Sequence, residues 1–245
     1  MSFCAPRHKG SKKTCFSQNS LIKIAKAFNK KYSKKKVKIS KNKNMLLENI
    51  KNNFPNFFKN EWCLLNKNFI KSLNDDEIND TFRPEKPKEW LKNERDWLST
   101  VDIEKVLSQY ENKYNDFITI GPVPIDFDKR DIRGNCTIDE LCNLKLKDLL
   151  KDKLYKLGIV FNLDKHDEPG SHWVALYGDL KKNDIYYFDS YGLEPPNEIE
   201  IFMNRMQEEG KKLNRNIDLY YNDIRHQFKN SECGVYCLNF IIQFL

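Results

Sequence analysis

The chain has 245 residues, of which 13% are aromatic and 31% charged, and its formal net charge at pH 7 is +7. This length suffices for one sizeable domain with an appendage or for two small domains. No run approaches the roughly 20 apolar residues of a membrane span and no signal peptide opens the chain, so we expect a soluble protein made in the cytosol. The seven cysteines are odd in number and lack paired CxxC spacing, which predicts reduced thiols rather than a zinc site or a disulfide scaffold.

The positive charge is confined to the N-terminal part of the chain. Residues 1–50 hold 13 Lys and one Arg against the single acid Glu48, a net charge of +13, whereas the remaining 195 residues sum to −6. Such a segment attracts polyanions, whether nucleic acid, an anionic surface or an acidic protein. A solvated basic face, or an arm that touches partners or the rest of the protein, fits the same pattern.

Helical periodicity recurs in this basic part. Apolar residues predict a helix over residues 21–28, capped by Asn19 or Ser20, and a second helix over 45–54. The stretch 30–43 between them is predicted to be a basic connector.

Two further predictions complete the arm. Residues 57–72 read as helical, with Trp62 and Leu65 buried, and the polar stretch 74–88 with its two prolines reads as a linker or boundary. We therefore expect a basic, mostly helical N-terminal arm over residues 1–85 and a second domain over residues 86–245.

The second domain is predicted to begin with helices and continue with strands. Ser99 or Thr100 is expected to cap a helix, and Glu198 begins another that ends at Gly210. The remaining predicted elements are an extended segment at 117–127, a helix at 137–150, strands at 157–163, 173–177, 185–188 and 219–221, and a last helix from 233. That last helix is apolar on nearly every face, which predicts a buried central helix. This order of elements indicates an α+β fold.

A cysteine at the start of the last helix is the first candidate for chemistry. At that position the helix dipole and unpaired backbone N–H groups favour the thiolate form of Cys233. Gly234 allows close approach of a backbone or substrate, and the Gln227 amide six residues upstream could donate to an oxyanion. The alternative is an ordinary core cysteine, which is also how we interpret Cys237 one helical turn later.

A thiolate nucleophile needs a base and a group that orients the base. Of the four histidines, His172 is the best candidate, because it opens the predicted strand at 173–177. Asp189 ends the next strand, and hairpin pairing of the two strands could bring its carboxylate to the imidazole. Each residue alone has an ordinary structural explanation, but with Cys233 and Gln227 they make a complete cysteine hydrolase set.

These residues resemble the active site of the ubiquitin-like-protein proteases with the adenovirus proteinase type of fold. In that family an HW dipeptide, an Asp or Asn roughly 17 residues on, and a Gln six residues before Cys-Gly form the site. The matching residues here are His172-Trp173, Asp189, Gln227 and Cys233-Gly234, accompanied by DSYG at 189–192, ECG at 232–234 and Trp97-Leu98-Ser99, which looks like the family's WLND-type helix. The likeness is closer still to the maturation proteases of large cytoplasmic DNA viruses, the African swine fever virus polyprotein protease type.

The resemblance implies a papain-like, adenain-type fold with a central mixed sheet and the nucleophile at the N-terminus of a buried helix. It implies that Trp97 and Trp173 wall a narrow tunnel for the substrate's glycines, next to Gly234. The implied activity is a cysteine endopeptidase that cleaves viral core precursors after Gly-Gly-like motifs during virion maturation, in the host cytoplasm (viral factory) and the virion. No metal or organic cofactor is implied.

Two other functions remain open at this stage. One is a protease that acts on host SUMO or ubiquitin, and the other is a non-catalytic protein that binds nucleic acid through residues 1–50. The resemblance covers roughly residues 89–245, and the basic arm does not match the viral arm, so its function does not carry over. The chain stops at Leu245 inside an apolar helix, so we expect that it is truncated at its C-terminus.

Overall fold

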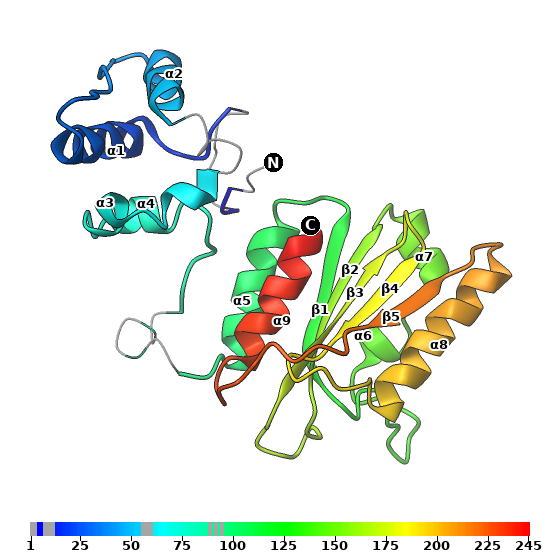
Figure 1. Ribbon diagram of the computed structural model, residues 1–245. Helices are drawn as coiled ribbons and strands as arrows, with labels where there is room; N and C mark the ends of the chain where they lie inside the picture. The colour runs from blue at the N-terminus through cyan, green and yellow to red at the C-terminus, as the bar shows by residue number, and fades with distance from the viewer. Residues whose placement is uncertain (1–3, 7–12, 55–60, 88–89, 91–92, 94–95) are drawn as a thin grey trace. The chain divides into compact units, whose positions relative to one another are not determined.

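The computed structural model describes residues 4–6, 13–54, 61–87, 90, 93 and 96–245, and the chain divides into two compact units, Met1–Glu85 and Lys86–Leu245. The N-terminal unit contains α1 (Gln18–Lys31), α2 (Lys43–Asn53), the 3-10 helix η1 (Glu61–Leu64), α3 (Asn68–Lys71) and α4 (Asp76–Asn79). Its core is built from one apolar face of each helix. Figure 1 shows these helices at the blue and cyan end of the chain.

The first two helices begin at side-chain caps. The Ser17 hydroxyl accepts from the Ser20 backbone N–H at the start of α1, and Asn42 does the same for Met45 in α2. The predicted caps Asn19 and Ser20 are therefore wrong, because α1 begins one turn earlier.

Two predictions for the N-terminal unit are corrected by the burial of particular side chains. Trp62 is 47% exposed, because the tight turn of η1 places Glu61 and Leu64 in the interior instead. The stretch predicted as a linker contains α4, whose Ile78 is buried in the core of the unit, and only its last residue, Lys88, lies outside the described residues. Residues 57–60 of the predicted helix also lie outside them.

The C-terminal unit is organised around a five-stranded mixed sheet in the order β1-β2-β3-β4-β5. Its strands are β1 (Phe117–Pro124), β2 (Lys156–Asn162), β3 (Trp173–Asp179), β4 (Asp184–Phe188) and β5 (Asp218–Tyr221). The outer pairs β1–β2 and β4–β5 are parallel, and the central pairs are antiparallel. The predicted α+β class, with a central mixed sheet, is confirmed.

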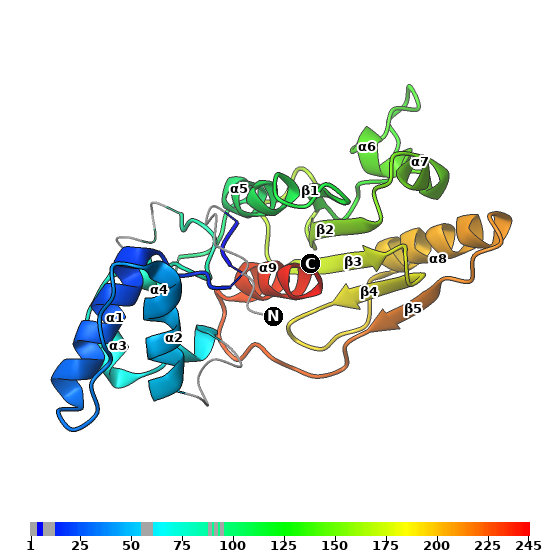
Figure 2. The ribbon, with the colours of Figure 1, turned by 90° about the horizontal axis from the view of Figure 1, so that it is seen from above.

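Helices cover both faces of this sheet. The helices are α5 (Thr100–Glu111), α6 (Asp139–Cys142), α7 (Leu146–Lys151), α8 (Asn197–Lys212) and α9 (Cys233–Phe244). Figures 1 and 2 show α5 and α9 on one face and α6, α7 and α8 on the other. Alternation along β3 follows this division, since Trp173, Ala175 and Tyr177 pack with α5 and α9, whereas Val174 and Leu176 pack with α8.

Two predicted helices differ from the observed ones. The helix expected at 137–150 is split into α6 and α7, because an unbroken helix would turn Leu141 and Leu146 about 140° apart, yet both are fully buried. The last helix, α9, is buried on one face only, since Val235 is 39% exposed. By contrast, the predicted cap Ser99 is confirmed: it forms a capping box with Asp102 at the start of α5.

Four of the cysteines are paired. Disulfides join Cys4 to Cys15 and Cys136 to Cys142, so the prediction that all seven are reduced thiols is wrong. A spacing rule based on CxxC pairs does not detect such loop closures. Cys63, Cys233 and Cys237 are free thiols. Among the helices that the structure describes, none has the length and apolar character to cross a bilayer.

Candidate active site

The candidate nucleophile lies where the sheet meets α9. Cys233 is the first residue of this helix, and only 1% of its surface is exposed. The preceding residue, Glu232, provides no side-chain cap for the first N–H groups of the helix. Backbone N–H groups of Trp173 and Gly234 donate to the Cys233 sulfur. This is an environment that favours a thiolate.

His172 and Asp189 meet as the pairing of β3 with β4 predicted. The imidazole Nε2 lies 2.7 Å from Asp189 Oδ1, and the side chains are 12% and 1% exposed. His172 precedes β3 and Asp189 follows β4, and these antiparallel neighbours bring the two positions to the same end of the sheet. Because Nε2 is engaged by the carboxylate, Nδ1 is the nitrogen left to face the Cys233 thiol, which contributes to the raised pKa of the ring.

The electrostatics of Cys233 and His172 favour a charged pair. Burial opposes the charge on the imidazole, but its hydrogen bonds to Asp189 and Cys233 outweigh that effect and raise the pKa of His172 to about 9. Burial also opposes a thiolate, yet the hydrogen bond to His172 and the N–H of Trp173 hold the pKa of the Cys233 thiol below its usual value. Thiolate and imidazolium therefore stabilise each other. By contrast, burial raises the pKa of Cys237 well above that of an ordinary thiol, which fits the packed role predicted for it.

A tight turn after β4 fixes the candidate orienting carboxylate. The Gly192 N–H donates to the Asp189 carbonyl at 2.9 Å, and the Tyr191 N–H donates to Asp189 Oδ1 at 2.9 Å. Gly192 has φ +74°, and a Cβ there would lie 2.7 Å from the carbonyl carbon of Ile224. Only glycine fits that backbone and that close approach.

The same turn holds the segment that carries Gln227. The Ser190 carbonyl accepts from the N–H groups of His226 (2.8 Å) and Gln227 (2.9 Å), and the Ser190 hydroxyl donates to Gln227 Oε1 at 2.7 Å. The Gln227 Nε2 donates to the Lys229 carbonyl and, at 3.4 Å, to the Tyr191 hydroxyl. Gln227 is thus fully buried in the same turn structure as Asp189, with one weakly engaged N–H. The predicted donation of the Gln227 amide to an oxyanion remains a prediction.

Two residues at the site were given no role by the sequence analysis. Asn222, just after β5, accepts from the Asp189 N–H and donates to the Asp189 carbonyl, both at 2.9 Å. Nothing in the sequence around Asn222 singled it out. Tyr191 stacks on the His172 ring, with ring centroids 4.7 Å apart, and the Arg225 guanidinium lies 5.1 Å from the centroid of the Tyr191 ring. The position of Tyr191 within the DSYG motif is the sequence signal that could have pointed to it.

The three predicted substrate-binding residues differ in exposure. Trp173 is 6% exposed and its indole N–H donates to the Leu98 carbonyl at 3.1 Å, whereas Trp97 is 48% exposed. A Cβ at Gly234 would lie 3.1 Å from Leu98 Cβ, so this glycine allows α9 to pack closely on the segment before α5. The tunnel expected between the two tryptophans remains a prediction.

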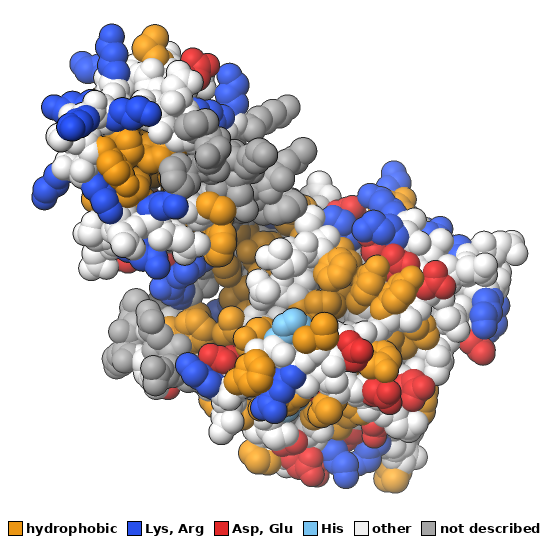
Figure 3. Space-filling view, in the orientation of Figure 1, with side chains coloured by type: hydrophobic (Ala, Val, Ile, Leu, Met, Phe, Trp, Pro, Cys, Tyr) orange, Lys and Arg blue, Asp and Glu red, His pale blue; other side chains and the backbone are white. Residues whose placement is uncertain are grey.

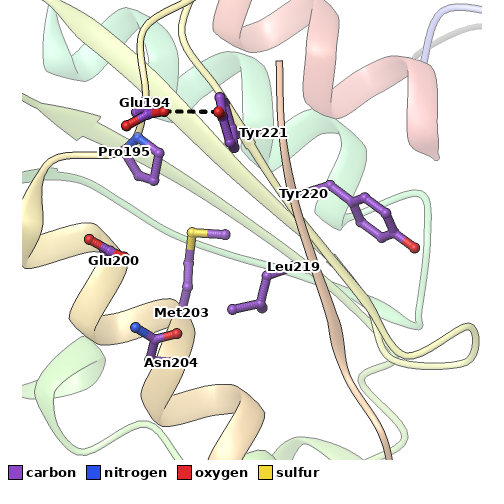
Figure 4. A pocket seen from close by; sticks show the side chains of 8 residues that line it. All are labelled: Glu194, Pro195, Glu200, Met203, Asn204, Leu219, Tyr220 and Tyr221. Carbon is purple, nitrogen blue, oxygen red and sulfur yellow. Dashed lines mark hydrogen bonds between the residues drawn. The ribbon is translucent and has the colours of Figure 1, made fainter. Parts of the chain in front are cut away.

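A groove elsewhere on the unit contains none of the candidate catalytic residues. It has a volume of about 290 Å³ and lies between β5 and α8 (Figure 4), lined by Glu194, Pro195, Glu200, Met203, Asn204, Leu219, Tyr220 and Tyr221. The Tyr221 hydroxyl donates to Glu194 across it at 2.9 Å. Within the described ranges, no group of three His, Cys, Asp or Glu side chains is arranged to hold a metal ion.

A family model and two viral relatives show that the chain is a cysteine-type peptidase. A family model described as the Ulp1 protease family, C-terminal catalytic domain, matches residues 145–245. The chain is 34% identical over 266 residues to R355 of Acanthamoeba polyphaga mimivirus, provisionally named a thiol protease, with 100% of this chain and 85% of R355 covered. The chain belongs to the Ulp1 protease family.

African swine fever virus provides a second relative. Its cysteine protease S273R is 29% identical over 154 residues, which cover 59% of this chain and 56% of that protein. The sequence match thus spans little more than half of S273R. The crystal structure of the same virus's pS273R protease shares the fold with a TM-score of 0.57 at 19% identity, over 98% of this chain and 84% of that one. The predicted family and fold are confirmed.

Proposed function

We propose that the protein is a cysteine endopeptidase with a Cys233-His172-Asp189 triad. The observation that carries the proposal is the His172–Asp189 pair, with Nε2 2.7 Å from Oδ1, whose imidazole lowers the pKa of the buried Cys233 thiol. The thiolate attacks the peptide carbonyl carbon, and His172 delivers its proton to the leaving amine. Water then attacks the thioester, with His172 as the base and Asp189 holding the ring in orientation.

The oxyanion that forms in both steps needs two donors. The Cys233 backbone N–H is one, since it lies at the free N-terminus of α9. The Gln227 side chain is the other: its Nε2 contact to Tyr191 is long, at 3.4 Å, so a substrate oxygen can replace it. Loss of one such donor typically costs about 10²–10³ in rate.

A labelling experiment tests the nucleophile. At pH 6 an ordinary thiol is scarcely ionised, so iodoacetamide should alkylate Cys233 faster than the exposed free thiol Cys63. Mass spectrometry of tryptic peptides measures both rates in one sample, and His172→Ala should slow only the reaction at Cys233. An unchanged rate at Cys233 in the His172→Ala variant would contradict the proposed thiolate.

The proposed substrates are viral structural or core precursors, cleaved after Gly-Gly-like motifs during virion maturation in the host cytoplasm and the virion. The viral origin of both relatives supports this proposal. The nearly buried Trp173, packed against Gly234, also favours a substrate with small residues before the cleaved bond.

Host ubiquitin-like proteins are the alternative substrates. The support is specific, because S273R of some African swine fever virus isolates is named a SUMO-1 cysteine protease. Incubation with SUMO and ubiquitin precursors, beside Gly-Gly-X peptides from viral precursors, separates the two, with Cys233→Ala as the blank. Cleavage of the host precursors without cleavage of the viral peptides would contradict the proposed role in virion maturation. A purely non-catalytic function is not retained, since the chain belongs to a peptidase family.

A further inference from the structure

A dense run of lysines lies on the N-terminal unit. Residues 23–43 include ten lysines and no acidic residue. Nine of these side chains are exposed, and all of them except Lys23 form what we call the lysine surface: Lys26, Lys30, Lys31, Lys34, Lys35, Lys36, Lys38 and Lys41. They occupy the C-terminal part of α1 and its connection to α2. Figure 3 shows Lys and Arg side chains over this unit, around an apolar patch.

The lysine surface has no counter-charge of its own within the residues that the structure describes. Lys23, which lies just before it, pairs with Asp75 and Glu77. None of the eight lysines has a carboxylate within ion-pair distance in the same described ranges. The N-terminal unit carries a net charge of +12 and the C-terminal unit −5. The positive field is therefore concentrated on one unit and is available to an external polyanion.

Side-chain amides hold the backbone of this surface in place. The Asn29 amide accepts from the Val37 N–H at 2.7 Å and donates to the Val37 carbonyl at 2.9 Å, and the Val37 side chain is buried. The Asn49 amide donates to the next carbonyl along the chain at 2.7 Å, and Gln18 donates to that of Lys41 at 2.7 Å. A connection ordered in advance loses less conformational entropy on binding than a disordered basic tail.

An aromatic side chain lies within the same surface. Tyr32 is 43% exposed, and its ring packs on Phe28 with centroids 4.6 Å apart. The Lys31 ammonium lies 5.9 Å from the Tyr32 ring centroid. A fixed aromatic face among lysines is an arrangement that proteins use to stack nucleobases while cations contact the phosphates.

We propose that the lysine surface binds nucleic acid through its phosphate backbone, without sequence preference. The residue type favours this ligand over an acidic protein: residues 23–43 contain no arginine, the side chain best suited to bidentate carboxylate pairing, whereas lysine binds phosphate as a point charge. A membrane fits less well, because Ile39 and Met45 are the only exposed aliphatic side chains within residues 26–45, too few to insert. The surface would hold the peptidase on nucleic acid through its N-terminal unit.

Salt-dependent binding tests the proposal on the full-length protein. Fluorescence anisotropy with a labelled single strand and a duplex of random sequence, between about 50 and 200 mM NaCl, should give a linear fall of log affinity with log salt. The slope should be about −0.9 for each phosphate contacted in the duplex and about −0.7 in the single strand. Comparison of the single strand with the duplex shows which form of nucleic acid the protein prefers.

A matched pair of triple variants locates the binding. Lys35→Gln/Lys36→Gln/Lys38→Gln should weaken binding at least about tenfold at the low-salt end and flatten the duplex slope by up to about 3. The control Lys145→Gln/Lys147→Gln/Lys151→Gln removes the same charge from exposed positions near α7 and should change the affinity less than about twofold. Circular dichroism and peptide cleavage by both variants check that the protein is folded.

Two results would overturn the proposal. Equal loss of binding in the two triple variants would mean a general charge effect rather than a site. Binding to phosphatidylserine vesicles, with none to single strand or duplex at low salt, would assign the lysine surface to membranes. Neither result would bear on the proposed peptidase activity, because cleavage of peptides is measured separately.

Discussion

Among its described residues, the C-terminal unit contains two His–Asp pairs of similar geometry, and only one lies beside a thiol. His172 Nε2 is 2.7 Å from Asp189 Oδ1, and His166 Nδ1 is 2.8 Å from Asp126 Oδ2. The histidine side chains are 12% and 46% exposed, respectively. A short contact between the two side chains is thus common to both pairs. Burial and the neighbouring Cys233 distinguish them, and these are the properties that make a histidine useful to a nucleophile.

The surroundings of the two carboxylates also differ. Asp126 accepts from both the ring and the backbone N–H of His166 in an exposed loop, and these bonds lower the pKa of Asp126 although burial opposes the change. Asp189 is almost fully buried and receives the Tyr191 N–H, while Asn222 binds its backbone. The first arrangement ties a loop together, whereas the second fixes a carboxylate in three dimensions.

Exchange of each histidine for alanine should give the largest contrast. His172→Ala removes the base and the counter-ion of the thiolate, so kcat/KM on a Gly-Gly-X peptide should fall by about 10⁴ or more. His166→Ala is the control and should stay within about twofold of the native enzyme. Equal losses in the two variants would show that the wrong histidine has been assigned as the base.

Exchange of each aspartate for asparagine should give the next largest contrast. Asp189→Asn keeps the shape of the side chain but removes the charge that stabilises the imidazolium, and kcat should fall by about 10²–10⁴. Asp126→Asn should change kcat less than about twofold. Steady-state kinetics on one peptide measures both variants, and an unchanged Asp189→Asn enzyme would remove Asp189 from the triad.

Much of the site could be predicted from sequence because its residues stand at the ends of regular elements. A strand that opens after His172, a strand that ends before Asp189 and a helix that begins at Cys233 are each readable from local pattern, and hairpin pairing of the strands then brings the side chains together. The contacts of Gln227 and Asn222 could not be predicted, since they depend on how two irregular segments meet.

The wrong predictions about the fold also concern short segments whose conformation depends on tertiary packing. Trp62 was expected inside because it is large and apolar, but the phase of a four-residue 3-10 helix decided its exposure. Cys136 and Cys142 form a disulfide across a short loop that no spacing rule anticipated. In each case, tertiary packing over a few residues outweighed composition.

The importance of the fixed carboxylate can be tested through Asn222. Asn222→Ala leaves the Asp189 carboxylate in place but frees its backbone, so kcat should fall about 10–100-fold while KM changes little. Asn222→Asp keeps one acceptor and should lie between alanine and the native enzyme. Asn143→Ala, at an exposed position after α6, is the control. A purely structural role would instead lower thermal stability and leave kcat of the folded enzyme unchanged.

The smallest expected effect is a displacement of the pH profile. The thiolate–imidazolium pair exists above the lowered pKa of Cys233 and below the pKa of His172, which is raised to about 9. The profile of kcat/KM should therefore rise on the acid side as the thiol ionises and fall near pH 9 as the imidazolium loses its proton. In Asp189→Asn the hydrogen bond that raises the histidine pKa loses its charge, so residual activity should fall away at lower pH than in the native enzyme. Asp126→Asn should leave this basic limb in place, because His166 takes no part in it. A basic limb that moves in both variants, or in neither, would mean that the limb reports a group other than the buried pair.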